Sequence, residues 1–140
     1  MVLISHRGNL DGPNTKLENN PVQVKSVILS GFDCEIDVWN INGHFILGHD
    51  GPSYPVKEKF LENKKLWCHA KNLQALEVML GNKNIHCFWH ENDDFTLTSK
   101  NFIWTFPEKS TGKKSVVVSL GKKSSDYQCY GICTDYPGSY

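Results

Sequence analysis

The fold is decided by the stretch Phe32-Asp33-Cys34-Glu35-Ile36-Asp37-Val38-Trp39, around which the rest of the chain is organised. Its residues alternate in the manner of a β-strand, so Glu35 and Asp37 project from one face while Ile36 and Val38 project from the other. Two carboxylates held side by side usually need a cation or a proton between them. The stretch therefore predicts a buried strand whose acidic pair belongs to a site.

Length and charge limit the function classes. The chain has 140 residues, and we expect residues 1–140 to form a single domain with its own core. Fifteen basic side chains balance fifteen acidic ones, which argues against a nucleic-acid partner but not against a small anionic ligand. No apolar run approaches the roughly 20 residues of a membrane span, and the first residues lack the flanks of a signal peptide. We therefore expect a cytoplasmic protein without stable membrane association.

The cysteine pattern agrees with that compartment. Five cysteines are an odd number, and no secretory signal accompanies them. Cys129 and Cys133 are four residues apart, which is not the CxxC spacing of a zinc or redox site. We expect all five to be reduced and structural: Cys34, Cys68, Cys87, Cys129 and Cys133.

Turn residues and hydrophobic spacing divide the chain into short elements. Asn20-Pro21 predicts a helix start, and the apolar residues after it keep helical spacing up to Gly31. Asn42-Gly43 predicts a tight hairpin turn. A short helix is expected within 56–63 and an amphipathic helix over 73–80. Strands are expected at 2–6, 45–47, 66–70, 85–89, 95–98, 101–105, 115–120 and 130–135.

Strands and helices alternate in the first part of the chain, which favours a parallel sheet with right-handed crossovers. Chemically reactive side chains gather where the predicted strands end. In α/β folds ligands bind at that edge, so these residues predict one site. They are His6, Glu35, Asp37, Lys71, His90 and Asp135, with His49 following the hairpin.

The order and spacing of these residues resemble the glycerophosphodiester phosphodiesterase family. The segments that carry the resemblance are His6-Arg7-Gly8, Glu18-Asn19, Glu35-x-Asp37, His49-Asp50 and Gly131-Ile132-x-Thr134-Asp135-x-Pro137. The match is specific over residues 4–50 and again over 131–137. Residues 89–105 look like short bacterial and phage relatives of that family.

The resemblance implies a chemistry. It assigns His6 and His49 as general acid and base, Glu35 and Asp37 as ligands of a divalent cation, usually magnesium or calcium, and Arg7 and Lys71 as phosphate contacts. We add His90 and Trp104 as predicted substrate contacts. A cation with two basic side chains neutralises a phosphodiester, and histidines titrate near neutral pH. We expect metal-assisted hydrolysis of a small phosphodiester such as a glycerophosphodiester.

Two departures from the family pattern qualify the expected site and fold. The family's third carboxylate ligand stands two residues before the lysine, where this chain has His69. Two interpretations follow. Either His69 is a third metal ligand, which would shift the metal preference toward transition metals, or it is a core histidine and Glu91, Asp93 or water takes the ligand's place. The family's eight-stranded barrel takes about 250 residues. We expect a reduced TIM-like barrel with β-hairpin insertions and few helices in its second half, completed or covered by a second subunit in a homodimer.

A less specific interpretation accompanies each assignment. The acidic pair could be neutralised by Arg7 and Lys71 without any metal, and Trp104 could be a core residue. The alternative function is a non-catalytic module that binds a phosphate ligand and has lost turnover. A cation between Glu35 and Asp37 would favour the enzyme.

Overall fold

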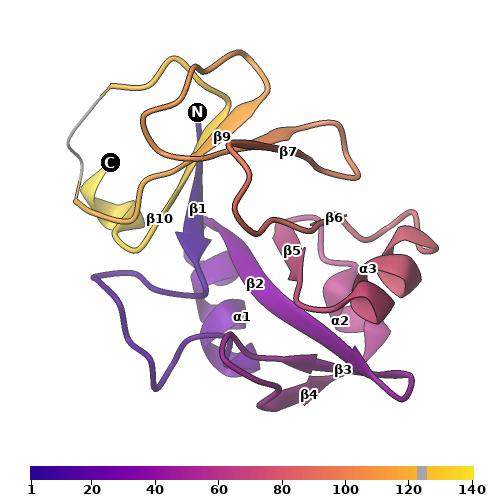
Figure 1. The fold of residues 1–140 in the computed structure, drawn as a ribbon. Coiled ribbons are helices and arrows are strands. Elements are labelled where there is room, and N and C mark those ends of the chain that lie inside the picture. Colours follow the sequence, from indigo (N-terminus) through magenta and orange to yellow (C-terminus); the bar gives the residue numbers. More distant parts are fainter. Residues whose placement is uncertain (123–125) are drawn as a thin grey trace.

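The computed structural model describes residues 1–122 and 126–140 (Figure 1). The elements in chain order are β1 (Val2–His6), α1 (Pro21–Leu29), β2 (Asp33–Ile41), β3 (His44–Leu47), β4 (Tyr54–Val56), α2 (Glu58–Leu61), β5 (Leu66–Ala70), α3 (Leu73–Leu80), β6 (Cys87–Phe88), β7 (Phe95–Leu97), β8 (Ile103–Thr105), β9 (Ser115–Val118), β10 (Gly131–Thr134) and the short 3-10 helix η1 (Pro137–Ser139).

The strands of the described residues form one ten-stranded sheet. Its neighbours β6-β5-β2-β1-β10-β9-β8 run parallel. Antiparallel strands extend it, since β3 and β4 fold back from β2, and β7 pairs with β8. The carboxyl ends of the parallel strands therefore share one edge, as the positions of the reactive side chains predicted.

Local sequence signals explain the elements that flank β2. The Asn20 side chain accepts a hydrogen bond from the backbone N–H of Val22 and caps α1, whose first residue is Pro21. Asn42 and Gly43 both have positive φ angles, 52° and 83°, as a two-residue hairpin turn between β2 and β3 requires. The predicted helix start and the predicted hairpin are both confirmed.

Two hydrophobic clusters occupy the two sides of the sheet. On one side, helices α1 and α3 cover the apolar face of β2, which presents Cys34, Ile36 and Val38. On the inner side of the curved sheet, β1, β5, β6, β8, β9 and β10 each contribute one buried residue to the second cluster: Ile4, Trp67, Phe88, Trp104, Val116 and Cys133. Because β2 buries its apolar face under helices, its acidic face turns inward.

The expected TIM-like barrel is wrong. The sheet is mixed and forms an open half-barrel, and β6 pairs only with β5 among the described strands. A TIM barrel needs a helix after each strand to cover its outer face, but the three α-helices of the described residues all end before residue 81. The described residues after α3 supply short strands, turns and polar loops without an amphipathic helical repeat, so this half of the sheet has no helical layer.

The five cysteines are free thiols, and only Cys129 is not buried. Burial raises the pKa of Cys68 and Cys133 well above the usual thiol value, so both are neutral packing residues. Among the described residues, no helix has the length and apolar character that crossing a membrane requires.

Candidate functional site

Asp37 lies at the centre of a group of polar side chains at the carboxyl edge of the sheet. Its carboxylate is fully buried. Arg7 Nε lies 3.1 Å from Asp37 Oδ2, and His49 Nδ1 lies 3.3 Å from the same oxygen. Lys71 Nζ lies 3.8 Å from the other oxygen, Oδ1. The structure therefore brings together residues that are far apart in the chain and that the sequence assigned to one site.

Asn19 fixes the orientation of this carboxylate. Its side-chain amide donates a hydrogen bond to Asp37 Oδ2 at 3.0 Å and accepts one from the Asp37 backbone N–H at 2.8 Å. Asn19 is buried and has a φ of 61°, a left-handed conformation that asparagine tolerates better than most residues. The loop before α1 therefore holds Asp37 from two directions.

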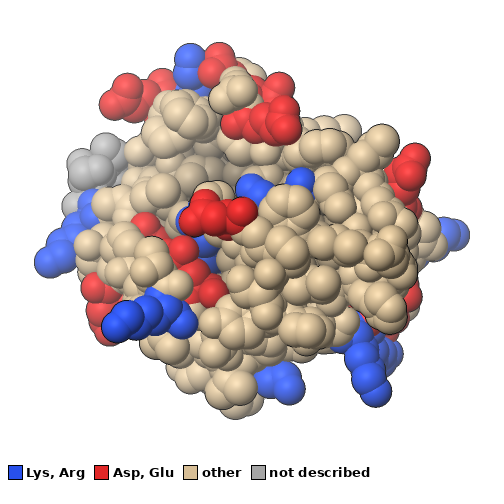
Figure 2. Space-filling view, turned by 60° about the horizontal axis from the view of Figure 1, so that its bottom comes forward, with Lys and Arg blue, Asp and Glu red and all other residues tan. Residues whose placement is uncertain are grey.

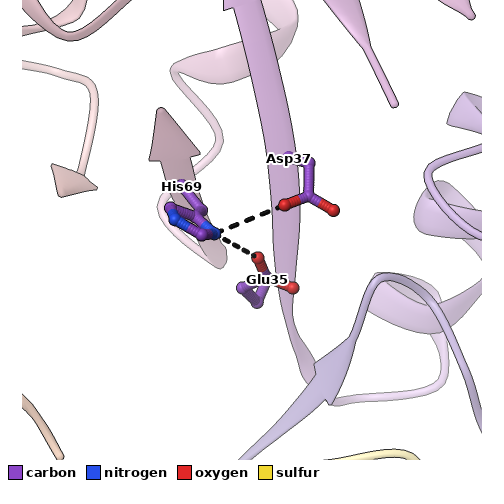
Figure 3. A group of neighbouring side chains, drawn as sticks. All are labelled: Glu35, Asp37 and His69. Carbon is purple, nitrogen blue, oxygen red and sulfur yellow. Dashed lines mark ion pairs between the residues drawn. The ribbon is translucent and has the colours of Figure 1, made fainter. Parts of the chain in front are cut away.

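Glu35, Asp37 and His69 form a compact group that could hold a metal ion (Figure 3). Asp37 on β2 and His69 on β5 are partners in the parallel register, so both side chains face inward together. His69 Nδ1 lies 3.3 Å from Asp37 Oδ1 and 3.6 Å from Glu35 Oε1. One ligand atom from each residue lies within 4.8 Å of the others.

The surroundings of His69 orient the ring for this role. Its Nε2 lies 2.9 Å from the backbone carbonyl oxygen of His90. A carbonyl can only accept, so Nε2 carries the proton, and Nδ1 presents a lone pair to the carboxylates whenever the ring is neutral. The ring also stacks on Phe88 with an interplanar angle of 4°. Backbone hydrogen bonding of the distal nitrogen is how metal-binding histidines are usually held.

The charges of this group shift its pKa values. Burial tends to raise the pKa of Asp37, but the hydrogen bond with His49, the ion pair with His69 and the charge of Arg7 outweigh it and hold that pKa well below its usual value. Burial tends to lower the pKa of His69, whereas its contacts with Asp37 and Glu35 raise it to about 9. Without an ion, cationic side chains therefore neutralise the acidic pair.

One oxygen of Asp37 still lacks a hydrogen bond. Asp37 Oδ1 is buried and has no hydrogen-bond partner among the described residues. Buried polar atoms without partners are rare in folded proteins and call for an explanation. This oxygen faces Glu35 and His69, so a cation held by the three residues would satisfy it.

His6 lies at the end of β1, beside Glu35 in the parallel register. Its Nδ1 lies 2.8 Å from Asp135 Oδ1, and Asn9 donates a second hydrogen bond to the same oxygen at 2.8 Å. Burial tends to raise the pKa of Asp135, but the bond with His6 outweighs it and lowers that pKa. An ionised Asp135 accepts a hydrogen bond from the Nδ1–H group of His6. This leaves Nε2 as the ring nitrogen of His6 that can accept or donate a proton.

His49 reaches the site from the hairpin that β3 completes. The backbone N–H of Gly48 donates to the Asp37 carbonyl at 3.1 Å, which holds the residue before His49 against β2. A side chain at Gly48 would place its Cβ 2.0 Å from the Gly51 carbonyl oxygen, so only glycine fits this turn. Arg7 Nη2 donates to His49 Nε2 across 3.2 Å.

The two predicted substrate contacts have different outcomes. His90 lies beside the metal group, since its carbonyl binds His69 and its ring centroid is 6.3 Å from that of His69. Burial and the charge of His69 lower its pKa. Trp104 is only 4% exposed, and its ring centroid lies 4.5 Å from that of Phe88 in the inner cluster. The assignment of Trp104 as a substrate contact is therefore corrected, because its ring fills the core.

Four side chains of the site had no chemical role assigned to them from the sequence. Asn19 and Glu18 belong to the family-like segment before α1, and Glu18 Oε2 lies 3.4 Å from Arg7 Nη1. Asp135 ends the last strand, which was a positional signal. Nothing in the sequence marked Asn9, which donates to both Glu18 and Asp135.

The site opens on the face toward which β1 points, the bottom of Figure 1. Figure 2 views that face and shows acidic and basic side chains gathered around a recess near its centre. The side chains of Arg7, His49 and Lys71 are 19%, 37% and 19% exposed, so solvent reaches the group around Asp37. A separate cavity of about 300 Å³ lies along the loop after β1, with Asn9 in its lining.

Comparisons of the chain with protein-family models, curated proteins and solved structures find no match.

Proposed function

We propose that the protein hydrolyses a small phosphodiester at the carboxyl edge of its sheet. The observation that carries the proposal is the convergence on Asp37 of two basic side chains, Arg7 and Lys71, and two histidines, His49 and His69. These are the groups needed to bind a phosphate, to hold a cation and to move a proton.

The residues present fit a divalent cation. Glu35 and Asp37 offer carboxylate oxygens, which magnesium, calcium and manganese prefer, and His69 offers an imidazole nitrogen, which suits zinc and other transition metals. The unsatisfied Asp37 Oδ1 lies within this donor set. A bound cation would supply Lewis-acid polarisation of a phosphoryl oxygen.

The chain's own residues would supply the remaining chemistry. Arg7 and Lys71 offset the negative charge of the phosphodiester, which otherwise repels a nucleophile. His6 is oriented by Asp135 and His49 by Asp37. One imidazole would accept a proton from the attacking hydroxyl or water, and the other would donate a proton to the leaving alcohol oxygen.

One observation favours the alternative, a phosphate-binding module without turnover. Arg7 Nε and Lys71 Nζ lie 3.1 Å and 3.8 Å from the Asp37 oxygens, close enough to offset the charge of this carboxylate. A phosphate could bind these two side chains while the acidic pair stays ion-paired. Such a module would be stabilised by phosphate yet release no product.

Hydrolysis of bis-(4-nitrophenyl) phosphate tests the proposal. We expect activity with magnesium, calcium or manganese, loss of activity with a chelator, and loss in folded His6→Ala and His49→Ala variants. The matched control is His44→Ala, because His44 is exposed on β3 away from the site. Activity unchanged by both site substitutions would contradict the proposal. Thermal stabilisation by phosphate with no product would favour the binding module.

A further inference from the structure

A large groove lies away from the candidate site. Its volume is about 1000 Å³, and it lies at the amino ends of β5 and β6 and just before β10. We call it the amino-end groove. The candidate site occupies the opposite, carboxyl edge of the same parallel strands, so the two sites do not share residues. Six lysines line the groove: Lys25, Lys57, Lys59, Lys64, Lys83 and Lys100.

The groove concentrates positive charge in a chain that is neutral as a whole. It holds six of the fifteen basic side chains of the protein. Glu62 is the one acidic residue in its lining, and Lys59 lies 2.6 Å from it. The formal charge of zero, which argued against a nucleic-acid partner, is an average over the whole surface and does not describe this groove. A local excess of lysines attracts polyanions regardless of the total charge.

Aromatic rings form part of the groove's surface between these lysines. Phe60, Phe102 and Tyr130 are half-buried and line the groove. The ring centroids of Phe102 and Tyr130 are 4.3 Å apart, and Lys25 Nζ lies 5.9 Å from the centroid of the Phe60 ring. Trp67, only 3% exposed, packs beneath Phe102 and supports it. The surface of the groove therefore combines aromatic rings with neighbouring lysine ammonium groups.

We propose that the amino-end groove binds nucleotide ligands, with phosphates on the lysines and bases against the aromatic rings, and that a single strand of nucleic acid is the ligand that fills it. Lysine ammonium groups contact phosphates as point charges, and aromatic side chains stack on bases of any sequence. A bare inorganic anion would leave the aromatic rings unused. A flat membrane surface would not enter a concave groove.

Fluorescence polarisation with a labelled oligothymidylate of about ten nucleotides tests the proposal. The test variant is Lys57→Gln/Lys64→Gln, because neither side chain makes an ion pair or hydrogen bond among the described contacts. The control is Lys16→Gln/Lys113→Gln, which removes the same charge from exposed positions outside the groove lining. Thermal unfolding checks that both variants are folded.

We expect the test variant to weaken binding about tenfold at low salt, while the control binds within about twofold of the unmodified protein. The slope of log K against log salt should fall in magnitude by about 1.4, since each phosphate contact on a single strand contributes about 0.7. Equal weakening by both variants, or by neither, would overturn the groove as the site.

Two further ligands test the chemistry of the groove. An abasic strand of the same length should bind more weakly than oligothymidylate, because it cannot stack on the rings. Equal binding of the abasic strand, or of inorganic polyphosphate, would overturn the nucleotide assignment. Thymidine monophosphate distinguishes the source of the ligand: weak competition supports a strand, and competition as strong as the oligonucleotide's would overturn the strand in favour of a mononucleotide.

Discussion

Replacing Asn19 by alanine tests whether the loop before α1 holds the acidic strand in place. The substitution removes the hydrogen bond to Asp37 Oδ2 and leaves the buried Asp37 backbone N–H without its partner. It also puts a Cβ-bearing residue without a polar side chain at a φ of 61°. A lost bond to a buried carboxylate, an unpaired N–H and left-handed strain together should lower the free energy of unfolding by about 3 to 4 kcal/mol.

Urea denaturation followed by circular dichroism measures this loss, with two matched controls. Asn19→Gly removes the same hydrogen bonds but relieves the backbone strain, so it should be about 1 kcal/mol less destabilising than alanine. Asn20→Ala removes only the cap of α1 and should cost about 1 kcal/mol. A loss below about 1 kcal/mol for Asn19→Ala, or one equal to that of Asn20→Ala, would refute this reasoning.

Three further predictions follow from other contacts. Burial and the charge of Lys100 lower the pKa of His86 to about 4. The contribution of His86 to the free energy of unfolding is therefore fully present above its unfolded pKa near 6.5 and is lost as the pH falls from there through 4. Chemical denaturation should show a loss of about 2 kcal/mol over that range, and a smaller loss in His86→Gln. Gly131→Ala would bring a Cβ to 2.8 Å from a carbonyl oxygen of β1, so its thermal midpoint should fall by several degrees, whereas Gly112→Ala, which meets open space, should leave it unchanged. Asp135→Asn should lower phosphodiester hydrolysis more than tenfold with little change in stability; full activity would show that Asp135 does not orient the proton-transfer group.

Local patterns predicted the central strand well. The alternation over residues 32–39 predicted that Ile36 packs on one face of the strand and Asp37 projects from the other. In the structure Ile36 is buried in the hydrophobic cluster and Asp37 is buried on the opposite face. The Asn42-Gly43 turn predicted the hairpin because few other residues adopt its backbone conformation. These features depend on neighbouring residues in the chain, so a sequence can reveal them.

Features that depend on distant partners were left open or mistaken. The sequence left His69 between a metal ligand and a core histidine, because its register with Asp37 and its contact with the carbonyl of His90 have no sequence pattern. Trp104 was assigned to the site by its place at a strand end, but its ring packs on Phe88 inside the half-barrel. The TIM-like barrel failed for a similar reason, because closure depends on a helical layer that the described residues after α3 do not supply.

Cation binding tests the central claim most directly. Titration of the protein with manganese, followed by electron paramagnetic resonance of the free ion, counts bound ions. We predict one ion per chain, lost in Glu35→Gln and in His69→Ala and retained in Glu77→Gln, which changes an exposed carboxylate on α3. Absence of binding to the unmodified protein at millimolar manganese, or binding unchanged in folded Glu35→Gln, would contradict a cation site at Glu35, Asp37 and His69.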